Sequence, residues 1–254
     1  MSAGSERVSK RREFHETLPQ EAAKTAHFLS RRNLRLTMNN QPVGASRIPK
    51  ATWLGLFVAL FGMLIARQIT YYFWPTPTFT AAVWKESLIW LCVIALLVII
   101  RRGERLPLTS VGIGTCPWWK SILWGLAMTI ICALVGFGIV HATHYGGADN
   151  PTVAAFSKLP VWLLVFIIFR AGVVEELFYR GYAIERLESL GLNRFWAVVI
   201  PLTIFGFGHW TGGWANILIA LALGVILSVF YVWRRDLVAN MIAHFLVDFL
   251  GNIH

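Results

Sequence analysis

Residues 118–142 read WWKSILWGLAMTIICALVGFGIVHA, and this apolar stretch indicates the class of the protein. Between Ser121 and Val140 it contains no Asp, Glu, Lys or Arg. A helix of about 20 apolar residues crosses the hydrocarbon layer of a bilayer, which is about 30 Å thick. The stretch therefore predicts a membrane-spanning helix.

Similar apolar segments lie on both sides of it. The predicted spans are 52–74, 80–100, 118–142, 160–180, 195–210, 214–233 and 237–253. We predict an all-α, polytopic transmembrane helix bundle over residues 51–254 with seven to eight spans. The eighth would be a re-entrant or interfacial segment within 106–117 or 181–194.

Residues 1–50 differ from the rest of the chain because they are polar and basic, with ten Lys and Arg against four Asp and Glu. They lack a steady apolar period, so we predict a mostly disordered tail with a short amphipathic helix around 21–36 that touches lipid. The net charge of +10 raises the question of nucleic-acid binding. The other basic residues lie in short clusters between apolar blocks, so we expect membrane lipids and no nucleic acid as partners.

The basic clusters lie in alternate loops. They are 101–105 after the second span, Arg180, Arg186 and Arg194 after the fourth, and Arg234 and Arg235 after the sixth. The loops between them contain Lys158 as their one basic residue. Seven crossings with a cytoplasmic N-terminus satisfy the positive-inside rule at every loop. A short chain without eukaryotic sorting signals favours a bacterial plasma (inner) membrane.

The fourth span holds Arg170, Glu175, Glu176 and Arg180 within FRAGVVEELFYR at 169–180. Each charge at the centre of a membrane helix costs about 2.5–3.5 kcal/mol, so four of them indicate a function. Glu176 and Arg180 are four residues apart and can form an ion pair on one helical face. Glu175 points about 100° away and is expected to face a cavity, as suits a general base. The alternative is that both carboxylates are solvated at the cytoplasmic membrane edge.

Two further spans carry polar residues. Phe205 and His209 end the fifth span, and His244 and Asp248 lie four apart on one face of the seventh. Taken alone, His209 fits a structural hydrogen-bonding group, and the His244–Asp248 pair fits a polar contact between helices. Because polar groups in membrane spans face the bundle interior, we expect these spans to converge with the fourth on one site inside the bundle.

The depth of His209 bears on this convergence. It lies about 22 Å along its span, deeper than Glu175 and His244 lie in theirs. The three side chains meet only if the fifth helix starts deeper, tilts or bends at Pro201.

The three motifs, Glu175-Glu176-x-x-x-Arg180, Phe205-x-x-x-His209 and His244-x-x-x-Asp248, resemble those of the CPBP family in type and order. This family, also called Abi, comprises CAAX prenyl endopeptidases and bacteriocin-processing enzymes. The resemblance covers about 105–253. It implies hydrolysis of a peptide bond in a membrane-anchored protein or peptide.

By motif position, Glu175 would activate water as the general base, while His209 and His244 would position the water and polarise the carbonyl. Glu176 and Arg180 would support the site, with Phe205 and Asp248 nearby. Where the family has Asn or Asp in the third motif, this chain has Asp248, which can donate to an oxyanion only when protonated.

The family has been described both as metalloproteases and as metal-independent glutamate proteases. Glu175, His209 and His244 are also a plausible zinc set, because catalytic zinc takes three protein ligands and a water. The signature His-Glu-x-x-His is absent from the sequence, so we favour a mechanism without an obligatory metal.

Two other classes of function remain open. Intramembrane His, Glu and Asp also build proton relays, which would make the chain a proton- or ion-coupled transporter, although no internal repeat is visible. A non-catalytic scaffold or bacteriocin-immunity protein of the same fold would not need Glu175.

Arg170 lies outside the motifs, and a buried Arg needs a partner. We favour pairing with Glu86 of the second span over binding of a substrate carboxylate.

Overall fold

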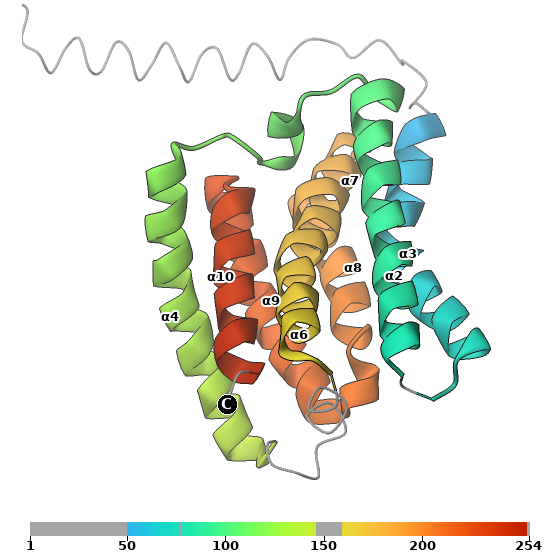
Figure 1. Ribbon diagram of the computed structural model, residues 1–254. Coiled ribbons are helices and arrows are strands. Elements are labelled where there is room, and N and C mark those ends of the chain that lie inside the picture. The colour runs from blue at the N-terminus through green and yellow to red at the C-terminus, as the bar shows by residue number, and fades with distance from the viewer. Residues whose placement is uncertain (1–49, 77, 146–158, 253–254) are drawn as a thin grey trace, which may run out of the picture. The chain divides into compact units, whose positions relative to one another are not determined.

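The computed structural model describes residues 50–76, 78–145 and 159–252, and these residues form helices joined by short connections (Figure 1). The predicted tail and its amphipathic helix lie outside the described residues. The helices are α2 Lys50–Phe73, α3 Phe79–Val98, η2 Ile99–Gly103, η3 Leu108–Val111, α4 Trp118–Thr143, α6 Val161–Arg170, η4 Ala171–Ile184, α7 Glu185–Ser189, α8 Arg194–Phe207, η5 Trp210–Gly212, α9 Trp214–Arg234 and α10 Leu237–Asn252. The described residues contain no strand, as predicted for an all-α protein.

Among the described residues, four helical segments are long and apolar enough to cross a membrane: α2, α3 continued through η2, α4 and α9. The chain is therefore an integral membrane protein. Two shorter apolar helices, α8 and α10, accompany them, so the count of seven to eight crossings stays a prediction. An eighth segment was expected within 106–117 or 181–194. The first stretch contains only the short helix η3, and 181–189 continues the helix of the fourth span.

The fourth span is the central column of the bundle. Figure 1 shows α6, η4 and α7 following one another through its middle, with α10 and α4 towards one side and α2 and α3 towards the other. Of the 14 residues of η4, all but Val173 are buried. The segment that carries Glu175, Glu176 and Arg180 is thus almost fully enclosed, which places these charges away from lipid.

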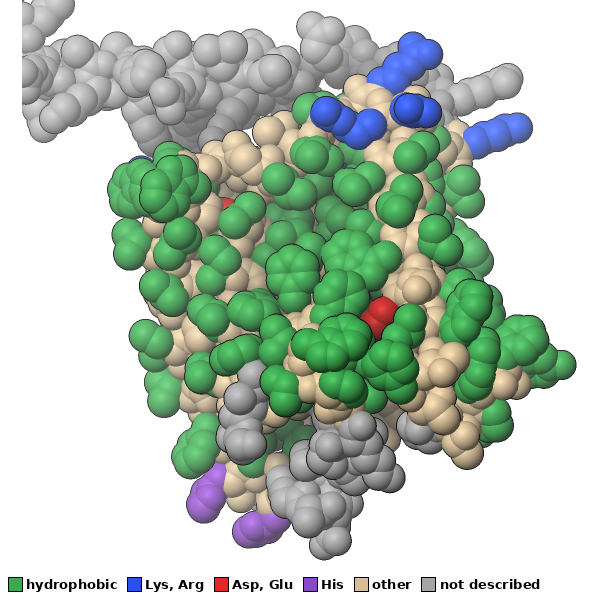
Figure 2. All heavy atoms as spheres, in the orientation of Figure 1, with side chains coloured by type: hydrophobic (Ala, Val, Ile, Leu, Met, Phe, Trp, Pro, Cys, Tyr) green, Lys and Arg blue, Asp and Glu red, His purple; other side chains and the backbone are tan. Residues whose placement is uncertain are grey.

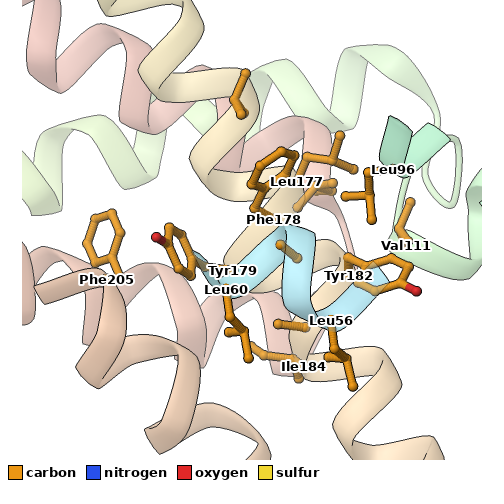
Figure 3. Close-up of a cluster of buried hydrophobic side chains, with 14 of the residues drawn as sticks. Leu56, Leu60, Leu96, Val111, Leu177, Phe178, Tyr179, Tyr182, Ile184 and Phe205 are labelled. Atoms are coloured by element: carbon orange, nitrogen blue, oxygen red, sulfur yellow. The ribbon is translucent and has the colours of Figure 1, made fainter. Parts of the chain in front are cut away.

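The apolar core surrounds this column. Figure 3 shows side chains from four other elements gathered around it, namely Leu56 and Leu60 of α2, Leu96 of α3, Val111 of η3 and Phe205 of α8. A second, smaller cluster joins α4, α9 and α10. Helices that belong to different parts of the sequence therefore fix the position of η4.

Glycine allows α10 to lie against η4 at close range. A Cβ atom at Gly172 would stand 2.8 Å from the backbone nitrogen of Phe245. Real side chains do not tolerate such a distance, so the two backbones can approach this closely only at a glycine. This contact brings His244, the neighbour of Phe245, to the face of η4 that carries Glu176.

A carboxylate holds one end of the bundle together. Glu104, just after η2, accepts hydrogen bonds from Thr52 Oγ1 (2.9 Å), Tyr182 Oη (2.8 Å) and Arg186 Nη2 (2.8 Å). On the face shown in Figure 2, Lys and Arg gather at this end and His at the opposite end. Such an asymmetry is the pattern that the positive-inside rule describes.

Candidate active site

Glu176 is the best-satisfied carboxylate of the site and is fully buried. Its Oε1 accepts from Arg180 Nη1 (2.8 Å) and lies 2.8 Å from His244 Nδ1, and its Oε2 accepts from Asn240 Nδ2 (3.0 Å). The predicted Glu176–Arg180 ion pair is confirmed. Because a carboxylate only accepts, the contact with Glu176 places a proton on Nδ1 of His244.

His244 is thereby held through Nδ1, and its other ring nitrogen, Nε2, faces different groups. Its Nε2 lies 3.5 Å from Asp248 Oδ2 and 4.0 Å from Glu175 Oε2. The spacing of four residues does put His244 and Asp248 on one face of α10, as predicted. The orientation of an imidazole by a carboxylate on Nδ1, with Nε2 left for chemistry, is a recurring device of hydrolytic sites.

The sequence predicted that Glu175 faces a cavity, but one of its carboxylate oxygens is bound by an arginine. Its Oε1 accepts a hydrogen bond from Arg170 Nη1 at 2.8 Å, and only Oε2 faces His244. The expectation assumed 3.6 residues per turn, whereas η4 is a π-helix with hydrogen bonds from residue i to i+5. In a π-helix, residues five apart come close to one face, which aligns Arg170 with Glu175.

Arg170 connects the site to α3. Its Nε donates to Glu86 Oε2 at 2.9 Å and its Nη2 to Glu86 Oε1 at 3.4 Å. The predicted pairing with Glu86 is confirmed, and both side chains are buried. With two carboxylates already bound to one guanidinium, the alternative of binding a substrate carboxylate loses its support.

His209 lies just beyond α8, at the turn into η5. Its Nδ1 lies 2.9 Å from the carbonyl oxygen of Phe205, and its own carbonyl accepts from Asn216 Nδ2 at 3.2 Å. A carbonyl oxygen accepts, so Nδ1 of His209 is the donor there and Nε2 is left for other contacts.

Phe205 is the residue on which the other motif side chains pack. Its ring centroid lies 4.8 Å from that of His209 and 6.2 Å from that of His244. The Arg180 guanidinium stacks over the Phe205 ring at 4.4 Å, and the Tyr179 ring meets it edge-on at 5.4 Å. This aromatic ring therefore holds apart two histidines and an arginine from three different segments.

A cavity of about 80 Å³ lies where these segments meet. His209, His244, Asp248, Phe205 and Asn216 line it together with Cys132 and apolar residues of α9 and α10. The fifth and seventh spans thus do converge, despite the depth of His209. Glu175 is not among the lining residues and approaches them through its contact with His244 Nε2.

The described residues contain no group of three or more His, Cys, Asp or Glu side chains arranged to hold a metal ion. Within the zinc set considered above, one oxygen of Glu175 is bound to Arg170 instead. The residues therefore do not fit a metal centre in this arrangement, and we derive no step through one.

Sequence reasoning missed Asn240, whose amide donates to Glu176 Oε2 and also to the Leu227 carbonyl at 2.9 Å. A signal for it was present, because Asn240, His244 and Asp248 repeat at a spacing of four along an apolar span. Such a polar stripe marks the face of α10 that turns towards η4 and α9.

Part of the chain is similar to a known protein family. Residues 157–250 match the family model described as type II CAAX prenyl endopeptidase Rce1-like. An uncharacterised protein, YpbD of Bacillus subtilis (strain 168), is 23% identical over 133 residues. That alignment covers 50% of this chain and 65% of the relative, so it spans less than two thirds of the relative's length. No solved structure matches the chain at a significant level.

The matched region contains all three motifs and every residue that lines the cavity except Cys132. The resemblance stated from the motifs is confirmed. Residues 157–250 of this integral membrane protein are thus similar to the Rce1-like type II CAAX prenyl endopeptidases.

Proposed function

We propose that this protein is an intramembrane endopeptidase that hydrolyses a peptide bond in a membrane-anchored protein or peptide. The observation that carries the proposal is the position of His244, held by Glu176 at Nδ1 while Nε2 lies near Glu175 and Asp248 beside a cavity shared with His209. The family match over 157–250 supports the class of reaction.

Glu175 is the general base. Its Oε1 is held by Arg170, and its Oε2 lies 4.0 Å from His244 Nε2. Two polar atoms at that distance can both hydrogen-bond to one water at about 2.8 Å. Oε2 takes a proton from this water, and the water oxygen attacks the carbonyl carbon of the scissile peptide bond.

The carbonyl oxygen then becomes an oxyanion that needs hydrogen-bond donors. A protonated Nε2 of His244 donates to it, and His209, on the other wall of the cavity, orients the carbonyl. When the C–N bond breaks, Glu175 returns its proton to the leaving amine. Asp248 acts through His244, because a carboxylate next to Nε2 favours the form in which that nitrogen carries a proton.

The test is cleavage by purified protein in nanodiscs, with a membrane-anchored peptide library as substrate and mass spectrometry of the products. Wild type is compared with Glu175→Gln and His244→Ala. The control is Glu188→Gln, which alters a surface carboxylate bound to Arg194 and Arg235. We expect both site variants to lose cleavage by at least about 100-fold while the control keeps it.

Cleavage that survives in both site variants would contradict the proposal and favour a scaffold or immunity role. Ion flux in liposomes without cleavage would favour the transporter. A chelator added to wild type addresses metal dependence in the same assay, and full activity in its presence is the result expected for a glutamate mechanism.

A further inference from the structure

Among the described residues, Arg67 of α2 has no acidic partner, unlike the three buried arginines of the fourth span. Arg170, Arg180 and Arg186 each bind a carboxylate. Among the described residues, the Nη1 atom of Arg67 donates to the carbonyl oxygen of Gly208 at 2.8 Å, and its guanidinium lies 5.8 Å from the centre of the Trp210 ring. Neither contact neutralises the charge. Charges within membrane helices pair with opposite charges or with backbone carbonyls. Arg67 has only a carbonyl among the described residues, so its positive charge remains available to an anion.

Arg67 lies at the polar end of an open groove of about 550 Å³ between α2 and α8. Gln68, Thr203 and Trp210 are the other groups there with polar atoms. The remaining walls are apolar and come from both helices, mainly Phe61, Leu64, Ile65, Ile204 and Phe207. The groove therefore combines one cation with a long apolar surface, which is suited to an anionic amphiphile.

The sequence of α2 places this groove relative to the membrane surface. Tyr71, Tyr72 and Phe73 end the helix and are 60%, 80% and 64% exposed. Exposed aromatic residues at a helix end are typical of the membrane–water interface. Arg67 lies about 6 Å inward from this aromatic belt, and Phe61 a further 9 Å towards the bilayer centre.

The polar end of the groove thus lies near the headgroup level, and its apolar walls extend into the hydrocarbon. A phospholipid of the same leaflet has this polarity and direction. We propose that the α2–α8 groove binds an anionic phospholipid, with its phosphate on Arg67 and one acyl chain along Leu64 and Phe61. The site is distinct from the cavity at His244 and does not depend on the proposed proteolysis.

The lipid would also bind close to Gly208, the residue that directly precedes His209. The same guanidinium that receives the phosphate holds the carbonyl of Gly208, which directly precedes His209. A phosphate on Arg67 would therefore bind the same guanidinium that holds the turn before His209.

Native mass spectrometry of the protein released from nanodiscs tests the site without any substrate. The probes are discs of phosphatidylglycerol and discs of phosphatidylcholine, and the variants are Arg67→Gln and Arg67→Lys. The matched control is Arg102→Gln, an exposed arginine at the basic end of the bundle. We expect wild type to retain one phosphatidylglycerol, and Arg67→Gln to bind it about tenfold more weakly, as for loss of a charge-assisted contact.

Arg67→Lys is expected to recover part of this affinity, and Arg102→Gln to behave as wild type. A second variant, Leu64→Trp, fills the groove but keeps the charge, and is expected to lose the lipid as well. Equal retention by wild type and Arg67→Gln, or equal retention of the two lipids by wild type, would overturn the proposal. Since no cleavage is measured, this outcome is independent of whether the protein is a protease.

Discussion

At the scale of single residues, the charges around Glu175 and Glu176 form two sets with different tolerance to substitution. In one, Arg180, His244 and Asn240 all converge on Glu176. In the other, Arg170 is shared between Glu86 and Glu175. Loss of Glu176 leaves an arginine without any carboxylate, whereas loss of Glu175 leaves Arg170 still bound to Glu86.

This difference predicts opposite phenotypes for the two adjacent glutamates. Glu176→Gln should lower the free energy of unfolding by about 3–5 kcal/mol, the usual cost of an uncompensated buried charge. Glu175→Gln should cost clearly less and should abolish cleavage instead. Thermal unfolding of both variants in the same detergent measures the first effect, and equal destabilisation by the two would contradict the assignment of roles.

Asp248 offers a second prediction, which rests on the proposed function. Asn has the same shape, can accept from His244 Nε2 through its oxygen and can donate to an oxyanion through its nitrogen. Asp248→Asn should therefore keep kcat within a few-fold, while Asp248→Leu, which removes the contact at 3.5 Å, should lower it by about 100-fold. An inactive Asp248→Asn would show that the negative charge itself is required.

Most of the ion pairs at the site were predicted from the sequence. Residues four apart predicted Glu176 with Arg180 and His244 with Asp248, and the need of a buried arginine for a partner predicted Arg170 with Glu86. The partner of Glu175 was not predictable in this way, because it depends on the number of residues per turn in η4. No periodicity in the sequence distinguishes a π-helix from an α-helix over this segment.

At the scale of the helix, the packing of α10 on η4 explains how two distant motifs meet. The sequence predicted both helices but not the distance between them. That distance is set by Gly172 of η4, which lies against the backbone of Phe245 in α10. Any side chain at Gly172 would meet the nitrogen, Cα and Cβ of Phe245 at 2.8–2.9 Å. His244 directly precedes Phe245, so it would then move away from Glu176.

Gly172→Ala should accordingly destabilise the protein by about 1–3 kcal/mol, the range for a forced backbone shift, and lower any activity that needs the Glu176–His244 contact. Gly136→Ala in α4 is the matched control, because a Cβ there has no neighbour within 4 Å. On helix propensity alone it should be neutral or stabilise by up to about 1 kcal/mol. Equal unfolding temperatures for the two variants would show that α10 adjusts without cost.

At the scale of the whole molecule, the family match covers only some of the residues that stabilise the candidate site. Residues 157–250 contain the motifs, but Glu86, which binds Arg170, and Glu104, which binds Arg186, lie before them. The pairing of Glu86 with Arg170 was predicted from the sequence, but that of Glu104 with Arg186 was not, because Glu104 belongs to no motif. In the structure, Glu86 and Glu104 supply the charges that neutralise two buried arginines of the fourth span.

Glu104→Ala should therefore destabilise the protein although it lies outside the matched region. Arg186 is 5% exposed and has Glu104 as its carboxylate partner among the described residues, so its loss should cost about 3–5 kcal/mol. Glu188→Ala is the control, because its partners Arg194 and Arg235 are 62% and 31% exposed and such pairs contribute about 0–1 kcal/mol. Denaturant unfolding in micelles compares the two, and similar midpoints would mean that the first helices do not stabilise the motif helix.

The number of membrane crossings depends on the two short apolar helices, α8 and α10. Helices α8 and α10 have 14 and 16 residues, which correspond to about 21 and 24 Å, less than the usual hydrocarbon thickness. If both nevertheless cross, five crossings separate Arg102 from Gly251, and the two positions lie on opposite sides of the membrane. The positive-inside rule predicts the cytoplasmic side for Arg102.

Single cysteines at Arg102, Trp214 and Gly251 test this arrangement after Cys92, Cys116 and Cys132 are replaced by Ala. All three test positions are exposed in the bundle. A membrane-impermeant maleimide should label Trp214→Cys and Gly251→Cys from outside intact cells, and Arg102→Cys only in inverted vesicles. If α8 stops inside the bilayer, Trp214→Cys will resist the reagent from both sides. If Arg102→Cys and Gly251→Cys react from the same side, an even number of crossings separates them and one of the short helices is re-entrant.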